Sequence, residues 1–173
     1  MEATGTMAAI SPWIERRFNF DFPVGLYPNV LARFRGTPAR LEDAVRGLSR
    51  AQLIAKADGK WSIQENAGHL LDEEGLFGKR LKEYLARAET LSPAPYLGLE
   101  LKHNDGGIQG ILGDFRAARE QQAEQLERLR VEDFARTAWH ARLQVAMRLV
   151  DHLLFIAEHD DHHLACIWEL RRK

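Results

Sequence analysis

Residues 61–72 have the sequence WSIQENAGHLLD, which marks the start of a long helix. Ser62 is followed three positions later by Glu65, the pattern of a capping box. In that arrangement the serine hydroxyl and the glutamate carboxylate each satisfy an unpaired amide of the first helical turn. Apolar side chains then recur at helical spacing: Leu70, Phe77, Leu81 and Tyr84. The stretch predicts a helix that begins after Ser62 and ends before the breaker at residues 92–93.

Three other regions show the same periodicity. Residues 24–48 predict one kinked helix or two short ones, because Thr37 and Pro38 offer an N-cap and a first-turn proline in the middle. Further helices are predicted from Gly107 to Leu129 and from about Arg142 to Arg171, joined by residues 131–141. No segment alternates as a strand would. The predicted fold class is therefore all-α, a four-helix bundle.

Composition limits the other possibilities. A chain of 173 residues with 45% apolar content can bury the core of a single domain. Lys and Arg number 24 against 25 Asp and Glu, so there is no basic excess for nucleic acid or acidic lipid. No segment approaches the ~20 apolar residues of a membrane span. We expect no nucleic-acid partner and no membrane partner.

The expected location is cytoplasmic. The single cysteine, Cys166, excludes an internal disulfide and fits a reducing compartment, and residues 1–11 do not resemble a secretion signal. We expect residues 1–23 to form a partly ordered amino-terminal extension and residues 24–173 to form the bundle domain.

A second informative stretch, residues 158–164, reads EHDDHHL. His159 and His163 are four apart, so on a helix they lie one turn apart and about 40° from each other, close enough to hold one cation. His162 points elsewhere and is interpreted as a surface residue or a neighbour of the ligands. His69 and His159 both flank the apolar face of their helices, where a metal ion can meet solvent or substrate. Three imidazoles with open positions are typical of catalytic metal sites.

Several acidic residues lie near these histidines. Asp72 and Glu73 can orient a ligand imidazole, bind metal or act as a base, whereas the capping box accounts for Glu65. For Asp160 and Asp161 a solvated helix face is the simpler interpretation.

Other candidates have plainer explanations. Cys166 can approach the metal site, but a buried small residue is the simpler interpretation. His152 lies about 10 Å along the helix from His159, too far to share an ion. His103 and His140 fall in connections, where a solvent-exposed or locally bonded histidine is expected. Trp61 is interpreted as a packing residue that can also wall the cleft.

Taken together, these motifs resemble the DinB-like metal-binding superfamily, which includes the YfiT-like proteins. The resemblance spans residues 24–172 and rests on Trp-Ser-x-x-Glu-x-x-x-His-Leu-x-Asp from Trp61 and on His-x-x-x-His from His159. It implies one divalent ion, nickel or zinc, bound by His69, His159 and His163. It also implies homodimers, and activities that include thiol transfer with bacillithiol and maleylpyruvate isomerisation with mycothiol.

These observations lead to three hypotheses. The first is a metal-dependent enzyme that activates a thiol or water for transfer or hydrolysis of a small-molecule substrate. A low-molecular-weight thiol is one candidate partner, and Glu73 or Asp72 is the candidate proton acceptor. The second is a non-catalytic metal-binding or stress-response bundle, and the third is a structural bundle with incidental histidines. Trp13 and three nearby phenylalanines supply apolar side chains for the predicted homodimer: Phe18, Phe20 and Phe22.

Overall fold

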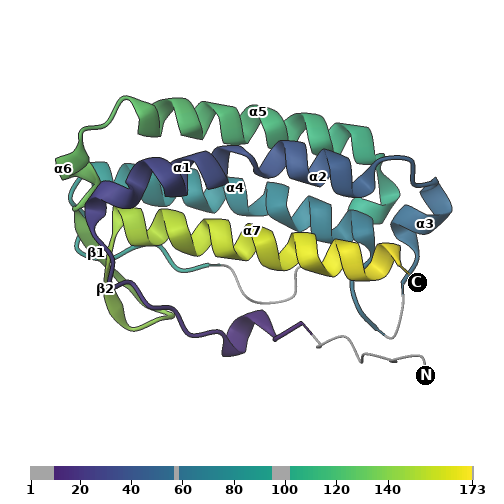
Figure 1. The fold of residues 1–173 in the computed structure, drawn as a ribbon, viewed down its shortest axis with the longest axis horizontal. Coiled ribbons are helices and arrows are strands. Elements are labelled where there is room, and N and C mark those ends of the chain that lie inside the picture. Colours follow the sequence, from purple (N-terminus) through teal and green to yellow (C-terminus); the bar gives the residue numbers. More distant parts are fainter. Residues whose placement is uncertain (1–9, 57–58, 95–101, 173) are drawn as a thin grey trace, which may run out of the picture.

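The computed structural model describes residues 10–56, 59–94 and 102–172. Figure 1 shows long helices lying side by side along one axis. Helices α4 (Ile63–Leu85), α5 (Ile108–Glu127) and α7 (Leu149–Arg171) form three rods, and α1 (Tyr27–Arg35) followed by α2 (Thr37–Val45) forms the fourth. The predicted all-α four-helix bundle is confirmed. None of the helices in these described ranges is long and apolar enough to cross a membrane.

Helix α4 begins where the sequence predicts. The Ser62 hydroxyl accepts a hydrogen bond from the Glu65 amide at 3.1 Å, and the Glu65 carboxylate accepts one from the Ser62 amide at 2.8 Å. The helix ends at Leu85, well before the predicted stop at residues 92–93. It ends there because Arg87 adopts a left-handed φ of 57°, which closes the last turn in place of the usual glycine.

The first rod is divided differently from the prediction. Thr37 does not cap α2, because Gly36 takes that position. The Thr37 hydroxyl instead donates to the Asp160 carboxylate at 2.7 Å. The residue predicted as a local cap is therefore a contact between α2 and α7.

The break also changes the hydrogen bonding of one backbone carbonyl. Pro38 has no N–H, so it cannot donate to the carbonyl of Phe34 four residues earlier. That carbonyl accepts a backbone N–H at the end of α1 and a hydrogen bond from the Arg119 guanidinium at 2.9 Å. The break in the first rod thus presents a polar acceptor inside the bundle, and α5 supplies one of its donors.

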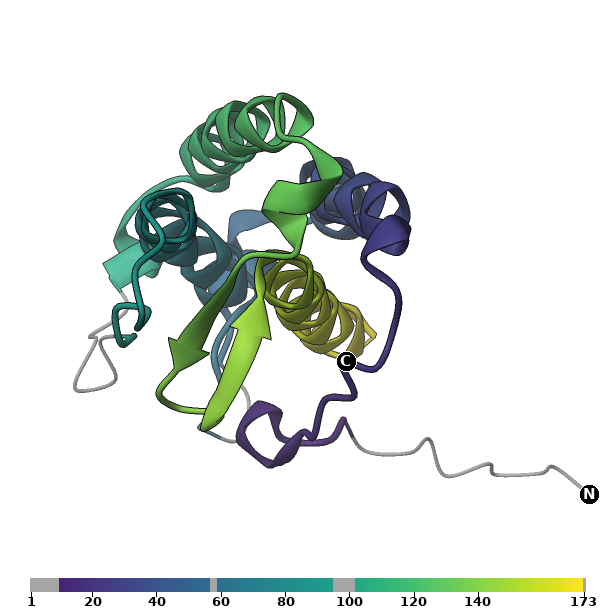
Figure 2. The same cartoon turned by 90° about the vertical axis from the view of Figure 1, so that its left-hand side faces the viewer.

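Residues 137–148 contradict the prediction that no segment forms a strand. They form an antiparallel hairpin of β1 (Thr137–His140) and β2 (Val145–Arg148), so α7 starts at Leu149 and not near Arg142. The hairpin lies across one end of the bundle (Figure 2). Trp139 adds backbone hydrogen bonds with the carbonyl of Glu89 and the amide of Leu91. A four-residue alternation is too short to stand out beside helical patterns.

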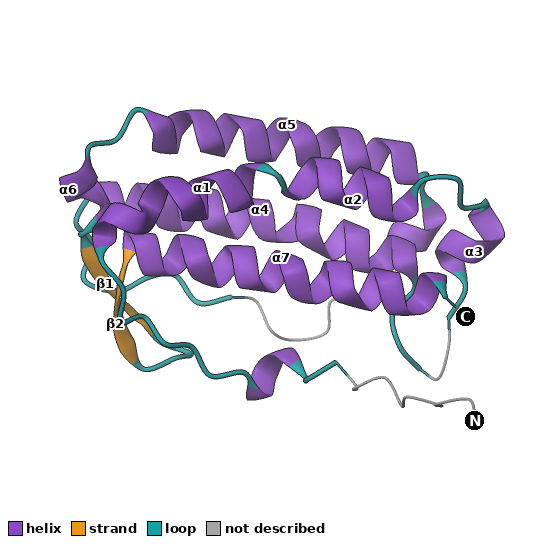
Figure 3. Ribbon diagram, viewed as in Figure 1, coloured by secondary structure: helices purple, strands orange, loops and turns teal. Residues whose placement is uncertain are grey.

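Short helices complete the chain, as the colouring of Figure 3 makes clear. Their bounds are η1 Trp13–Glu15, η2 Val24–Leu26, α3 Arg50–Ile54, η3 Lys102–Asp105 and α6 Val131–Phe134.

Residues 10–22, here called the strap, run beside the bundle along α7 (Figure 1). The Arg148 guanidinium holds the strap by donating to the carbonyls of Phe20 and Phe22 at 2.8 and 3.0 Å. The strap aromatics are partly buried against the chain's own core: Trp13, Phe18, Phe20 and Phe22. They therefore give no argument for a second copy of the chain, and the homodimer stays a prediction.

A buried charged layer crosses the centre of the bundle. Arg119 of α5 is 1% exposed and pairs with Glu74 of α4 at 2.5 Å and with Asp160 of α7 at 2.6 Å. Thr37 brings α2 into the same group through its bond to Asp160. All four rods therefore meet at one guanidinium.

The layer separates two apolar clusters. On each rod, the charged or polar residue stands between a residue of one cluster and a residue of the other. The pairs flanking it are Phe34 and Leu41, Leu70 and Phe77, Phe115 and Ala123, and Ile156 and Leu164. The core thus consists of two apolar clusters, or blocks, separated by this buried charged layer. The layer is called the seam below.

Replacing Arg119 should test how much the seam matters. We expect Arg119→Met to lower the free energy of unfolding by about 3–5 kcal/mol, because two carboxylates lose their partner in a dry interior. Urea denaturation measures the effect, and Arg35→Met, which breaks an exposed pair with Glu127, should cost under about 1 kcal/mol. A loss at Arg119 as small as the loss at Arg35 would contradict the role of the seam.

Candidate metal centre

Three histidines from two helices meet beside the bundle core. The Nε2 atom of His159 lies 3.2 Å from Nε2 of His69 and 3.2 Å from Nε2 of His163. One ring nitrogen from each residue lies within 4.8 Å of the others. Helices α4 and α7 are therefore neighbours, as binding of one ion by His69, His159 and His163 requires.

Asn66 fixes the orientation of one ring. Its amide nitrogen donates to the Ser62 carbonyl at 2.8 Å, so its amide oxygen faces Nδ1 of His163 at 2.9 Å. An oxygen can only accept, so Nδ1 carries the proton and Nε2 carries the lone pair. Metal-binding histidines usually have such a partner on the nitrogen that does not bind metal.

Burial keeps the three rings uncharged. It lowers the pKa of His69 to about 4, despite the opposing effect of Asp72. Burial and the neighbouring imidazoles place the pKa values of His159 and His163 well below the ordinary value. Neutral rings offer the lone pairs that metal binding needs.

The spacing of the nitrogens fits a metal ion. Two ligand nitrogens at ~2.0–2.1 Å from zinc in tetrahedral geometry lie about 3.3 Å apart, and two of the Nε2 separations are 3.2 Å. Nδ1 of His69 is buried without a partner among the described residues, whereas His163 has Asn66. The donor set is three neutral nitrogens, which leaves other coordination positions for exogenous ligands.

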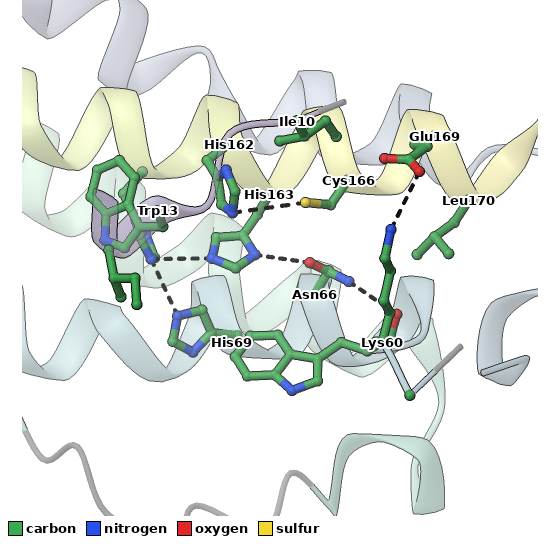
Figure 4. Close-up of a pocket in the computed structure, with 14 residues that line it drawn as sticks. Ile10, Trp13, Lys60, Asn66, His69, His162, His163, Cys166, Glu169 and Leu170 are labelled. Atoms are coloured by element: carbon green, nitrogen blue, oxygen red, sulfur yellow. Dashed lines mark hydrogen bonds and ion pairs between the residues drawn. The ribbon is translucent and has the colours of Figure 1, made fainter. Parts of the chain in front are cut away.

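A cavity of about 530 Å³ opens onto the three rings. Figure 4 shows the rings of His69 and His163 between Trp13 at one end and Lys60 at the other. The Trp61 ring packs on His69 at 4.9 Å and stacks on His163 with an interplanar angle of 13°. The candidate site is accordingly reached from outside and partly walled by aromatic rings.

Comparison with known proteins agrees with this geometry. A model of the DinB superfamily matches residues 33–167. The chain belongs to the DinB superfamily. A comparison with curated proteins finds no match to this chain.

A solved structure shares the DinB fold seen here. YfiT from Bacillus subtilis, described as a probable metal-dependent hydrolase with an unusual four-helix bundle topology, superposes with a TM-score of 0.80. The two chains are 23% identical, and the match covers 91% of this chain and 93% of YfiT. At this identity the likeness supports the fold alone.

The predicted proton acceptors lie outside the residues that line the cavity. Asp72 pairs with Nε2 of His103 at 2.8 Å, so His103 makes a long-range contact where a local one was expected. Its ring lies against α4 at Gly68, where a Cβ would come within 2.1 Å of it. Burial raises the pKa of the Glu73 carboxyl.

Two histidines match one of the alternatives predicted for them, and one aspartate does not match its prediction. His140 is locally bonded, because its Nδ1 accepts a hydrogen bond from the Leu143 amide at 3.3 Å, but it is also buried on β1 with its Nε2 3.4 Å from the Arg80 guanidinium. His162 is a neighbour of the ligands, since it lines the cavity and its ring centroid lies 5.1 Å from that of His163. Asp160 is buried, whereas Asp161 pairs with surface arginines as expected.

Sequence reasoning missed two contributors to the site. Asn66 lies in the quoted motif, but nothing in the sequence says that its amide reaches a histidine 97 positions away. Trp13 lies in the strap, and its ring meets His159 edge-on with centroids 5.0 Å apart. The i, i+3 spacing of Asn66 and His69 is the one signal that could have suggested Asn66.

Substitutions should separate ligands from neighbours. We expect His163→Ala to lose most metal affinity, and Asn66→Leu to lose about 10–100-fold, because the ring would lose its orienting partner. His162→Gln is the matched control, since it changes a cavity histidine outside the triad and should keep its metal. Metal content after dialysis, with circular dichroism to check folding, provides the measurement. Full retention of metal by His163→Ala would show that His163 is not a metal ligand.

The metal-free protein should lose stability on acidification. Six histidines have folded-state pKa values below the unfolded value of ~6.5: His69, His140, His152, His159, His162 and His163. The unfolded chain therefore takes up more protons below about pH 6.5, and the free energy of unfolding falls by up to about 1.4 kcal/mol per pH unit for each histidine. Burial raises the pKa of Glu74 to about 6, which opposes part of this trend.

Urea denaturation in a chelator at pH 7.5, 6.5 and 5.5 measures this slope. His152→Phe removes one of the buried imidazoles. The slope of the unfolding free energy against pH should therefore fall by up to about 1.4 kcal/mol per pH unit, the contribution of one proton. The ring lies among Phe77, Tyr84 and Phe155, so phenylalanine suits its surroundings. Equal stability at pH 7.5 and 5.5 would contradict the prediction.

Proposed function

We propose that this protein is a metal-dependent enzyme that activates a thiol or a water molecule for attack on a small electrophilic substrate. The observation that carries the proposal is the convergence of three Nε2 atoms at the wall of an open cavity. A structural metal site closes around its ion with four protein ligands, whereas three ligands and an open side suit catalysis.

Nickel or zinc is the proposed ion, held by His69, His159 and His163. Imidazole nitrogen suits both metals, and the described cluster contains no carboxylate that would favour a harder ion. The three ligands are neutral, so a bound divalent cation would keep its full charge. That charge favours anionic ligands such as thiolate or hydroxide.

When bound, the ion would lower the pKa of a thiol or water so that the thiolate or hydroxide is available near neutral pH. The chain's own residues do the rest. Asn66 holds the proton of His163 on Nδ1, and Trp61 covers two of the rings on one side. Glu73 is the proposed proton acceptor because it lies one helical turn after His69 on α4, and burial raises the pKa of its carboxyl.

Two observations support catalysis over passive metal storage. The cavity is large enough for a small molecule. YfiT, which shares the fold, is described as a probable metal-dependent hydrolase. The hydrolase and the thiol transferase use the same open position and differ in the nucleophile, water or a low-molecular-weight thiol.

An activity screen tests the proposal. We expect zinc- or nickel-loaded protein to hydrolyse an activated ester such as 4-nitrophenyl acetate, or to transfer one of several small thiols to monochlorobimane. His163→Ala should abolish the activity, and Glu73→Gln should lower it about 10²–10⁴-fold if the carboxylate accepts a proton. His162→Gln serves as control for the intact metal site.

The outcomes are distinct. Metal-loaded protein that processes neither kind of electrophile would favour a metal-binding bundle without turnover. Equal activity in the presence and absence of metal would contradict the proposal outright.

A further inference from the structure

The cavity beside the histidines has walls from four parts of the chain. One face of α7 lines it with His159, His162 and Cys166, α4 contributes Asn66 and His69, and Trp61 and Lys60 approach from the segment before α4. The strap supplies a further wall through Ile10, Trp13 and Ile14. The strap and the segment before α4 are far apart in sequence, yet both line this cavity, as Trp13 and Lys60 show in Figure 4.

The strap wall is held in place. Arg16 reaches from the strap to the backbone carbonyl and carboxylate of Glu158, both at 3.4 Å. The Trp13 ring packs on Phe18 and Phe155, with centroids 5.2 and 5.0 Å away. Trp13 is therefore fixed against His159 by neighbours on both the strap and α7.

The cavity surface is mostly apolar where it is free to contact a ligand. Trp61 is 39% exposed and Ile14 is 80% exposed, so both present apolar area to this space. Small-molecule sites combine walls of this kind with a few polar groups. Flat rings on the two sides of the histidine cluster suit a flat apolar group, because aromatic rings pack offset or edge-on at 4.5–7 Å.

The cavity wall away from the histidines does not favour a charged substrate body. The charged residues that line the cavity are Lys60 and Glu169, and they face each other at 3.5 Å. Their charges have opposite sign, so they offset one another. The Asn66 amide is already engaged by His163 and Ser62.

We propose that the substrate carries an uncharged aromatic body, which packs between Trp13 of the strap and Trp61 while its reacting group reaches the three histidines. The strap is then the element that selects the substrate. This inference rests on the proposed function, because the reacting group needs a metal at His69, His159 and His163.

Two metal-binding probes that differ only in their apolar part test the inference. Benzohydroxamate and acetohydroxamate share the same chelating group, so the ratio of their dissociation constants reports the contribution of the phenyl ring. Calorimetry with the zinc-loaded protein should show benzohydroxamate binding about tenfold tighter or more, as burial of a phenyl ring predicts. Trp13→Ala should reduce this preference to less than about threefold while acetohydroxamate affinity stays the same.

Two further variants make the result interpretable. Ile14→Glu changes an exposed side chain, so it should fold normally and still weaken benzohydroxamate selectively. Trp168→Ala is the matched control, because Trp168 is a 38% exposed tryptophan of α7 that lies outside this cavity. The ratio of the two hydroxamate dissociation constants in Trp168→Ala should equal the ratio in the wild-type protein.

Each failure has a separate meaning. Zinc-loaded wild-type protein that binds both hydroxamates equally, or a Trp13→Ala variant with an unchanged preference, overturns the aromatic pocket and leaves the metal site standing. Protein that takes up no zinc overturns the proposed function and the pocket inference with it.

Discussion

The buried guanidinium of Arg119 is the contact on which the arrangement of the four rods depends. It binds carboxylates from α4 and α7 and the Phe34 carbonyl at the break in the first rod. Apolar packing alone tolerates sliding or rotation of one helix against another, whereas a directional charge pair in a dry interior does not, since a displaced partner would leave a buried charge uncompensated. The seam thus fixes the register of two apolar blocks that could otherwise pack in several ways.

The register of the helices also determines where the histidines lie. Asp160 follows His159 in α7, so holding its carboxylate toward Arg119 sets the rotation of the helix and turns His159 and His163 toward α4. On α4, the same guanidinium binds Glu74. This contact fixes the position of α4 along its axis, and with it the position of His69, which lies little more than one turn before Glu74. The three nitrogens can stay this close only if each helix keeps its rotation about its axis and its position along that axis. A shift of more than about 0.5 Å would separate them. We infer that the charged seam supports the geometry of the candidate site as well as the fold.

Features that depend on neighbouring positions in the sequence could be predicted from it. The capping box at Ser62, the periodicity of the rods and the four-residue spacing of His159 and His163 each depend on neighbouring positions, and the structure reproduces them. The seam could not be predicted this way, because Asp160 and Asp161 look alike in sequence and differ only in the direction that the helix gives them. The same holds for Arg119 beside Arg116, of which one is buried and the other pairs with Glu42 at the surface. The hairpin depends on the distant backbone of residues 89–91, which no local pattern reveals.

The site divides its tasks between rigid and connecting segments. Ligand nitrogens sit on α4 and α7, whose positions are fixed by the seam, while the cavity walls come from the strap and the segment before α4. Loops and extensions accept substitutions that a packed helix cannot, because fewer neighbours must move with them. A change in Trp13 or Ile14 can therefore alter which molecule reaches the histidines without disturbing the histidines themselves. If the proposed function holds, the bundle determines the chemistry that is available, and the outer segments determine which molecule undergoes it.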